Sequence, residues 1–241
     1  MTNPSQTSVR NYLLRLMSPD DFSLICSNFV PFKADRGTIL YKNDDPIEEA
    51  YFFEAGVGSL ITMSTEGQAA ESGLFGRDGF CPTALIMGSD RSACDCVVQV
   101  PAEGYRMPIN SLVAAVEGRA SLRNLLLRYV QAQNVQTAHT ALSNAVHHVD
   151  QRLARWLLMI HDRIDGHELQ VTHEFLSLML AVRRPSVTTA LHTLEGELLI
   201  RSERGCIIVR DRPLLEAYAR GAYGSPEAEY ERLLMPVRRQ E

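Results

Sequence analysis

The sequence has no long apolar run, few cysteines and little lysine. Its purely apolar stretches, such as Trp156 to Ile160, are far shorter than the roughly 20 residues that cross a bilayer, so we expect no membrane-spanning protein. Five cysteines are an odd number at irregular spacing and do not suggest a disulfide framework, so reduced thiols are expected. Residues 1–10 are polar and lack the apolar core of a secretory signal. We therefore expect a cytoplasmic protein with no membrane partner.

The motifs of the common enzyme classes are also missing. The sequence contains no G-x-S-x-G, no phosphate-binding P-loop, no H-E-x-x-H and no G-x-G-x-x-G. No metal site is predicted, because Cys94-x-Cys96 lacks the C-x2-C spacing of structural zinc sites. Since alternate positions of a strand face the same side, buried core thiols are favoured over a metal ligand or an oxidant sensor. We expect neither catalysis nor a resident cofactor.

The composition is that of a folded protein whose net charge does not by itself attract DNA. Of 241 residues, 45% are hydrophobic and 22% are charged, which suits one large domain or two modest ones. The 24 basic and 29 acidic side chains give a net charge of −5, so any DNA-binding surface has to be local. All basic residues except Lys33 and Lys42 are arginines, which make planar two-point contacts with phosphate and guanine.

The predicted secondary structure changes from strands to helices near the middle of the chain. Between residues 33 and 108, short apolar segments alternate with turns at residues 43–46, Gly56, 66–67 and 77–79, which predicts the many short strands of a sandwich or barrel. From Leu112 to residue 163 there is no proline, and Gly118 is the only glycine. The sequence predicts long helices in this part, one of them over residues 121–146.

The predicted helix over residues 121–146 carries an apolar stripe that needs a partner. The stripe keeps a 3-4 spacing with one slip and consists of Leu122, Leu125, Tyr129, Ala132, Val135, Ala138, Leu142 and Ala145. Glutamines interrupt it, so a pure leucine zipper is excluded. The pattern favours a helix that pairs with a second copy of the chain. The alternative is a helix packed on its own domain.

Residues 169–210 give the strongest indication of local structure in the sequence. Thr172 suits the N-cap of a short helix, and Pro185 suits the first turn of a second helix, which places a turn at residues 181–184. One face of the second helix is apolar, through Val187, Ala190, Leu191 and Leu194. The opposite face is polar, through Arg183, Arg184, Ser186, Thr188, Thr189, His192 and Thr193. A helix-turn-helix of this kind can place its second helix in the major groove.

The segment after these helices reads as a wing. Residues 201–209 form a strand, a turn and a second strand. No acidic residue lies between Leu176 and Leu194 to repel phosphates, which favours DNA binding over the alternative of two hairpins that merely pack.

Together these features resemble the Crp/Fnr (cyclic-AMP receptor and fumarate-nitrate regulator) family of bacterial transcription regulators. The resemblance covers nearly the whole chain and includes Thr172-His173-Glu174, the run from Arg183 to Val187, and Leu199-Ile200. It implies an α+β fold with an N-terminal cyclic-nucleotide-binding-like β-roll (1–120), a long dimerisation helix (121–146) and a C-terminal winged helix-turn-helix (147–220). Residues 221–241 are expected to form a polar C-terminal tail.

The resemblance also implies partners and DNA contacts. A homodimer would place two recognition helices in successive major grooves of double-stranded DNA, about 34 Å apart, and RNA polymerase is the expected protein partner. The candidate DNA-binding residues are Thr172, His173, Arg183, Arg184, Ser186, Thr188, Thr189, His192 and Arg204. Pro185 and Thr189 stand where the cyclic-AMP receptor has a glutamate and an arginine that read bases, so the target sequence should differ.

The resemblance extends only in part to a cyclic-nucleotide site. The phosphate-holding half is present as Arg91-Ser92-Ala93, but Phe80 replaces the ribose-binding glutamate after Gly79, and Ala138 replaces a purine-facing hydroxyl next to Thr137. Each lost hydrogen bond costs about 1–3 kcal/mol, so we do not expect cyclic AMP to be the effector. The candidate effector-binding residues are Gly79, Arg91, Ser92 and Thr137, where Arg91 holds either another anion or a salt bridge of the β-roll. The alternative function is a cyclic-nucleotide or small-anion sensor that does not bind DNA.

Overall fold

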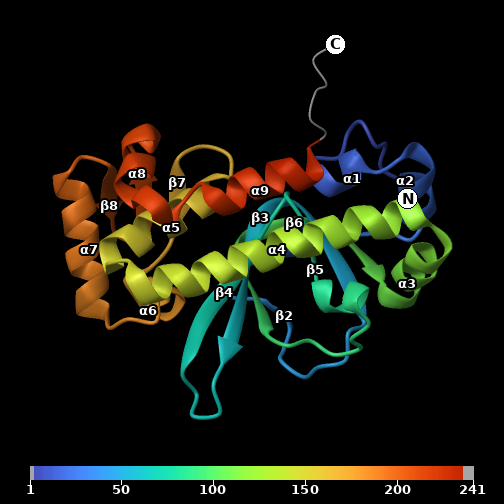
Figure 1. Ribbon diagram of the computed structural model, residues 1–241, viewed down its shortest axis with the longest axis horizontal. Helices are drawn as coiled ribbons and strands as arrows, with labels where there is room; N and C mark the ends of the chain where they lie inside the picture. The colour runs from blue at the N-terminus through green and yellow to red at the C-terminus, as the bar shows by residue number, and fades with distance from the viewer. Residues whose placement is uncertain (1–2, 236–241) are drawn as a thin grey trace.

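The computed structural model describes residues 3–235 and has two halves joined by a long helix (Figure 1). The N-terminal half contains a six-stranded antiparallel sheet in the order β1-β6-β3-β4, with β2 paired to β6 and β5 paired to β3. Its elements are α1 (Tyr12–Leu16), α2 (Pro19–Cys26), β1 (Val30–Ala34), β2 (Ile39–Tyr41), β3 (Glu49–Met63), β4 (Ala69–Phe75), β5 (Phe80–Cys81), η1 (Thr83–Met87), β6 (Asp95–Pro108) and α3 (Ile109–Gly118). The expected β-roll in an α+β fold is confirmed.

The two central strands are longer than the sequence predicts. β3 continues through Gly56, where a turn is expected, and its pairing register with β6 shifts between Phe53 and Val57. Gly56 has a φ of +88°, and a Cβ there would lie 2.4 Å from the carbonyl oxygen of Pro101. Because glycine alone tolerates this conformation and this close approach, the strand bends and keeps its hydrogen bonds. The predicted turn at Gly56 is therefore wrong.

The C-terminal half is a bundle of short helices with a small three-stranded sheet. Its elements are α5 (Val149–His161), β7 (Glu168–Gln170), α6 (His173–Met179), α7 (Arg184–Gly196), β8 (Ile200–Glu203), β9 (Cys206–Val209), α8 (Arg212–Ala219), η2 (Arg220–Ala222) and α9 (Ser225–Leu234). The sheet has the order β7-β9-β8. Val57 and Leu74 of the β-roll belong to the same buried apolar cluster as Leu157 of α5 and Leu191 of α7. The two halves therefore share an apolar interface.

The joining helix α4 (Ala120–Val146) divides its apolar stripe between two environments. Leu122, Leu125, Tyr129 and Ala132 are buried within the chain, at most 5% exposed. For these four positions the alternative of packing on the helix's own domain is correct. The second half of the stripe behaves differently, because Ala138, Leu142 and Ala145 are exposed and Val135 is half-buried.

The expected polar tail instead contains a helix. α9 runs alongside α4 back to the N-terminal half (Figure 1). Leu234 is 4% exposed within the core of the N-terminal half, and the hydroxyl of Tyr230 donates to the carbonyl oxygen of Asp78 at 2.6 Å. The expectation of a polar tail overlooks two sequence signals of this helix, Pro226 in its first turn and the helical spacing of Tyr230, Leu233 and Leu234. Residues 236–241 of the expected tail lie outside the described residues.

Across residues 3–235, the structure has no helix long and apolar enough to span a bilayer.

Candidate nucleic-acid interface and effector domain

The helix-turn-helix forms as the sequence predicts. The side chain of Thr172 caps α6 by accepting from the backbone N–H of Phe175 at 3.2 Å. The turn contains Ala181 at a φ of +50°, and Pro185 lies in the first turn of α7. The apolar positions of α7 are at most 3% exposed: Val187, Ala190, Leu191 and Leu194. Packing of this face fixes the opposite face of α7 toward solvent.

The exposed face of α7 is rich in hydroxyls whose protons are already used. Thr188, Thr189 and Thr193 each donate to the backbone carbonyl four residues earlier, at 3.2, 3.1 and 3.0 Å. Toward solvent these threonines therefore offer acceptor lone pairs and methyl groups rather than donors. His192 is exposed and Ser186 is half-buried on the same helix.

Cationic groups surround the beginning of α7 and the wing. Arg183 and Arg184 take part in no ion pair within residues 3–235. Nδ1 of His173, at the beginning of α6, lies 3.3 Å from Oγ1 of Thr188. The structure thus brings these predicted residues of both helices to one side of the domain, although their role in DNA contact stays a prediction.

The predicted wing is formed by β8 and β9. Arg204 is exposed in the turn between them, next to Gly205 at a φ of +76°. Pairing of β9 with β7, which no local sequence pattern indicates, anchors the wing to the segment that precedes α6.

Phe80, at the turn where the resemblance places a ribose-binding glutamate, is packed among aromatic side chains. Phe80 is 1% exposed and lies between the rings of Phe52 and Tyr129, with ring centroids at 5.6 and 5.4 Å. A Cβ at Gly79 would lie only 1.9 Å from the hydroxyl oxygen of Tyr129, so α4 is in contact with this turn. An aromatic stack therefore occupies the place that the family resemblance gives to a carboxylate.

The other candidate effector residues are bonded to protein groups. Arg91 donates to the carbonyl oxygen of Asp44 at 2.6 Å and lies 3.7 Å from its carboxylate. Ser92 is buried and donates to the carbonyl of Cys94 at 2.7 Å, and Thr137 donates to the carbonyl of Gln133 at 3.1 Å. Of the two roles considered for Arg91, these contacts favour the salt bridge within the β-roll.

The cysteines of the β-roll lie in or near its core. Cys81 and Cys96 are at most 1% exposed, with their sulfur atoms 4.0 Å apart, whereas Cys94 is only half-buried. Burial raises the pKa of the Cys94 thiol to about 11, so its thiolate is disfavoured at neutral pH. The expectation of a buried core thiol is confirmed for Cys96 but wrong for Cys94, which precedes β6 and is only half-buried.

Two polar contacts near the junction of the halves are not anticipated from the sequence. Arg163, two residues after the end of α5, donates two hydrogen bonds to Asp78, from Nε to Oδ1 at 3.0 Å and from Nη2 to Oδ2 at 2.5 Å. Glu71 of β4 is 5% exposed, and its Oε2 lies 2.6 Å from the hydroxyl of Ser59. Burial raises the pKa of Glu71 to about 7, although hydrogen bonding to Ser59 and the charge of Arg155 oppose the shift. Arg163 and Asp78 lie 85 residues apart, so no local sequence signal marks their contact, whereas Ser59 and Glu71 lie on the neighbouring strands β3 and β4.

Comparison with known proteins gives the same fold. Residues 151–218 match the Crp-like helix-turn-helix domain. FixK2 from Bradyrhizobium japonicum superposes with a TM-score of 0.67 at 15% identity, over 79% of this chain and 96% of that one. The c-di-GMP responsive global regulator CLP of Xanthomonas campestris gives 0.64 at 16% identity, over 80% and 100%. A Crp/Fnr-family transcriptional regulator from Thermus thermophilus gives 0.63 at 20% identity, over 80% and 100%.

No curated protein sequence matches this chain. The domain match and the structural neighbours nevertheless confirm the resemblance drawn from the sequence. The chain has the fold of these solved structures, and its residues 151–218 match the Crp-like helix-turn-helix domain.

Proposed function

We propose that the chain is a homodimeric, sequence-specific DNA-binding regulator of transcription that does not use cyclic AMP as its effector. The main support is the exposed side of the Crp-like domain, where Arg183, Arg184 and Arg204 have no ion-pair partner among residues 3–235. Cations that no carboxylate neutralises are available for DNA phosphates, while the buried face of α7 keeps the helix in place. A regulator of this kind works in the bacterial cytoplasm with RNA polymerase as its partner.

The hydroxyl groups of α7 that already donate within the helix restrict the set of bases that α7 would recognise. Thr189 presents its methyl group and an acceptor oxygen, since its proton is bonded to Pro185. In the major groove, acceptors pair with the amino groups of adenine and cytosine, and methyl groups contact the thymine methyl. We therefore expect A·T-containing steps opposite the middle of α7, with His192 adding a polar contact nearby.

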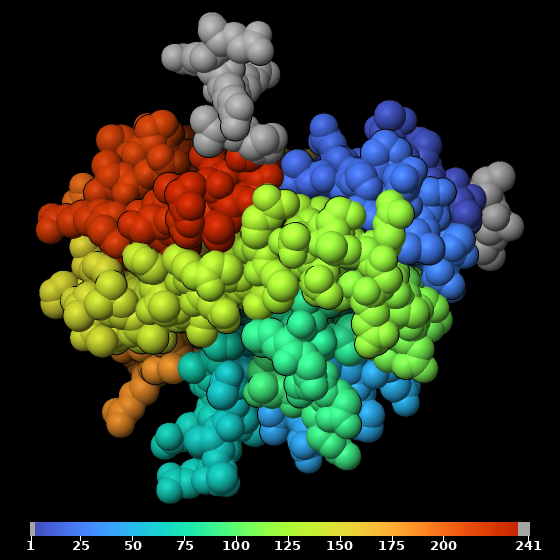
Figure 2. All heavy atoms as spheres, turned by 45° about the vertical axis from the view of Figure 1, so that its right-hand side comes forward, coloured from blue at the N-terminus to red at the C-terminus, as the bar shows by residue number. Residues whose placement is uncertain are grey.

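The exposed face of α4 supports a dimer. Val135, Ala138, Leu142 and Ala145 follow a heptad spacing, and Leu142 is 50% exposed. Figure 2 shows α4 as a long exposed ridge across one face of the molecule. Burying such a stripe against the α4 helix of a second copy would remove apolar surface from water and place the two α7 helices on the same duplex.

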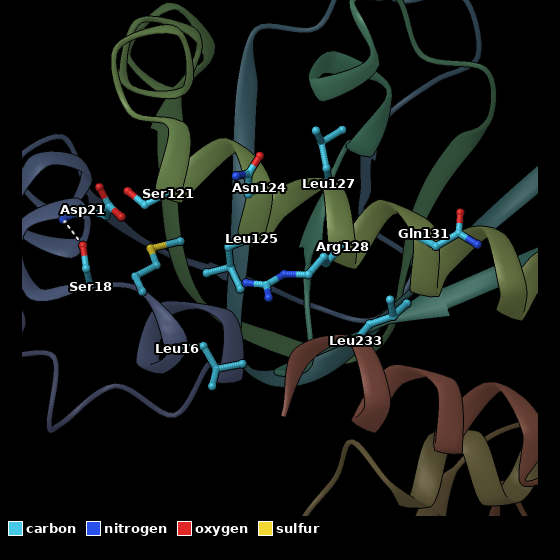
Figure 3. A pocket seen from close by; sticks show the side chains of 11 residues that line it. Leu16, Ser18, Asp21, Ser121, Asn124, Leu125, Leu127, Arg128, Gln131 and Leu233 are labelled. Atoms are coloured by element: carbon cyan, nitrogen blue, oxygen red, sulfur yellow. Dashed lines mark hydrogen bonds between the residues drawn. The ribbon is translucent and has the colours of Figure 1, made fainter. Parts of the chain in front are cut away.

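The same face of α4 continues into an open groove. Figure 3 shows Asn124, Arg128 and Gln131 along this groove, which has a volume of about 730 Å³ and lies between α4 and the segment of α1 and α2. These residues precede Val135 at heptad spacing, so a partner helix on the apolar stripe would also cover the groove. Polar residues at this end would set the register of the pair rather than its strength.

The aromatic stack around Phe80 supports an effector other than cyclic AMP. A ribose hydroxyl brought to this position would meet the rings of Phe52 and Tyr129 and no carboxylate. Leaving buried polar groups of a ligand without partners costs about 1–3 kcal/mol each, which corresponds to two or more decades of affinity for two lost contacts. The effector domain is therefore degenerate toward this ligand.

The experiment is a gel-shift titration with the full chain on a duplex selected from random oligonucleotides. Arg184→Ala should weaken binding and flatten the dependence of log K on log salt by roughly 2, since each phosphate contact of the two subunits contributes roughly 0.9. Arg15→Ala, which removes an exposed arginine from α1, is the matched control and should change neither quantity. An unchanged affinity of Arg184→Ala would contradict the proposal and would favour a sensor that does not bind DNA.

A further inference from the structure

A cavity of about 260 Å³ lies beneath α9, where the two halves of the chain meet. Its walls come from α4, the loop before β5, the end of α5, the start of α8, and α9. Tyr129, Gln133 and Asp78 belong to the N-terminal side, and Arg163 and Tyr230 to the C-terminal side. Pockets for small ligands are concave, combine apolar rings with a few polar groups, and often lie between domains. The volume is slightly below the usual range of roughly 300–1,000 Å³, so it suits an occupant smaller than a drug-sized ligand.

The two arginines in the cavity wall are already neutralised. Arg163 is bound by Asp78 through two hydrogen bonds and donates to the carbonyl of Met159. Arg212 donates to Asp162 at 2.6 Å and makes an ion pair with Glu216 at 2.7 Å. An anionic occupant would have to compete with these carboxylates for both guanidinium groups. The wall therefore does not offer a free cation.

Two further carboxylates leave the cavity with a negative excess. Glu227 and Glu231 line it and form no ion pair within residues 3–235, although Oε2 of Glu227 accepts from the backbone N–H of Gly224 at 2.8 Å. With Asp78 and Asp162 they make four acidic groups against two basic ones, a difference of −2 for the lining. Arg155 lies behind the wall, but its charge acts on Glu71 as well as on Glu227. The net field inside the cavity therefore favours a cation.

The tyrosines of the lining add ring surface and acceptors. Three of them have engaged phenolic protons: Tyr129 donates to Gln133 at 3.1 Å, Tyr223 to Asp162 at 2.9 Å, and Tyr230 to the carbonyl of Asp78. Tyr223 is also occupied by Arg212, which donates to its oxygen at 2.7 Å and lies over its ring, so the rings of Tyr129 and Tyr230 are the ones open to a ligand. The oxygens of Tyr129 and Tyr230 can therefore only accept further hydrogen bonds. Aromatic faces and acceptor oxygens together match an ammonium or guanidinium group on an apolar body.

We propose that this cavity is a binding site for a small organic cation, with an amine or guanidinium group against Glu227 and Glu231 and an apolar body against the tyrosine rings. Because both halves of the chain line the cavity, an occupant would restrain α9 and α5 relative to α4. A consequence for DNA binding rests on the proposed function, whereas the binding itself does not.

The test is calorimetry of the full chain with tyramine and agmatine as cationic probes. The anionic control is 4-hydroxyphenylacetate, which keeps the ring of tyramine and replaces its amine by a carboxylate. We expect heat of binding with at least one cation and none with the anion. Binding of the anion as tightly as tyramine, or no binding of either cation to the folded protein, would overturn the proposal.

Variants locate the site. Glu231→Gln should lower the affinity for the cation by about fivefold, as expected for a partly exposed charge pair. Ala132→Leu should abolish binding, because Ala132 is 5% exposed and lines the cavity. Glu229→Gln, on the same helix but paired with Arg232, is the matched control and should change nothing. Equal binding by Glu231→Gln and Glu229→Gln would place the ligand elsewhere.

A parallel gel shift separates this inference from the proposed function. If no cation binds but a DNA consensus is still recovered, the proposed cation site is refuted and the proposed function is not. If a cation binds but no DNA consensus is recovered, the proposed cation site is supported and the proposed function as a DNA-binding regulator is refuted. If Ala132→Leu unfolds in a thermal melt, the comparison of Glu231→Gln with Glu229→Gln decides.

Discussion

The free energy of unfolding should depend on pH through one buried carboxyl group, that of Glu71. Burial raises the pKa of Glu71 to about 7 from an ordinary value of 4.5. At about 1.4 kcal/mol per pKa unit, this shift corresponds to about 3 kcal/mol. Oε2 of Glu71 and Oε1 of Gln99 both face the hydroxyl of Ser59, at 2.6 and 2.8 Å. Because this hydroxyl carries a single proton, it cannot donate to both oxygens at once, so its hydrogen bond to Glu71 opposes the effect of burial on the pKa only in part.

The sign of the effect follows from the raised pKa. Below pH 4.5 the group is protonated in both the folded and the unfolded state, and its favourable contribution is fully present. As pH rises toward about 7 the unfolded state ionises first, so this contribution is lost, and above the folded pKa the loss is complete. Glu71→Gln keeps a neutral donor and removes the titration. The free energy of unfolding of the wild type should therefore fall relative to that of the variant by about 3 kcal/mol between pH 4.5 and 8.

Urea unfolding at several pH values, followed by the fluorescence of the single tryptophan Trp156, measures this difference. Glu66→Gln removes an exposed carboxyl group from the turn between β3 and β4, and it is the matched control. Its curve should run parallel to that of the wild type. Parallel curves for Glu71→Gln and the wild type would refute the reasoning, because Glu71 would then titrate like an exposed group.

Three further perturbations test other parts of the account. Asp78→Ala should reduce the free energy of unfolding by about 3–5 kcal/mol, because it leaves the buried guanidinium of Arg163 unpaired, and adding Arg163→Met should restore part of the loss in urea titrations. Leu142→Asp should give a monomer in ultracentrifugation with an unchanged circular dichroism spectrum, whereas a persistent dimer would move the interface away from α4. Calorimetry with cyclic AMP should show no tight binding, and a micromolar constant would contradict the interpretation of Phe80.

The helix-turn-helix is predictable because its signals are local. The cap at Thr172, the proline at Pro185 and the apolar spacing of α7 act within a few residues, and the structure reproduces each of them. The bend at Gly56 shows the limit of such reasoning, because a glycine marks both a turn and a close approach of another strand. Only the contact with Pro101, which is distant in sequence, decides between the two.

Features that depend on distant parts of the chain are harder to predict. The first half of the α4 stripe packs within the chain and the second half stays more exposed, although both have the same periodicity. α9 looks polar because most of its surface is solvated, while Leu234 inserts into the opposite half of the molecule. The buried pair of Asp78 and Arg163 likewise joins residues that no spacing rule connects.

The most direct test of the central claim is selection of duplexes from a random library by the purified chain, followed by sequencing. The account predicts an enriched inverted repeat with half-sites centred roughly 10 base pairs apart, as two copies of α7 in successive major grooves require. Recovery of no consensus, or of a single unrepeated site bound by one copy of the chain, would contradict it.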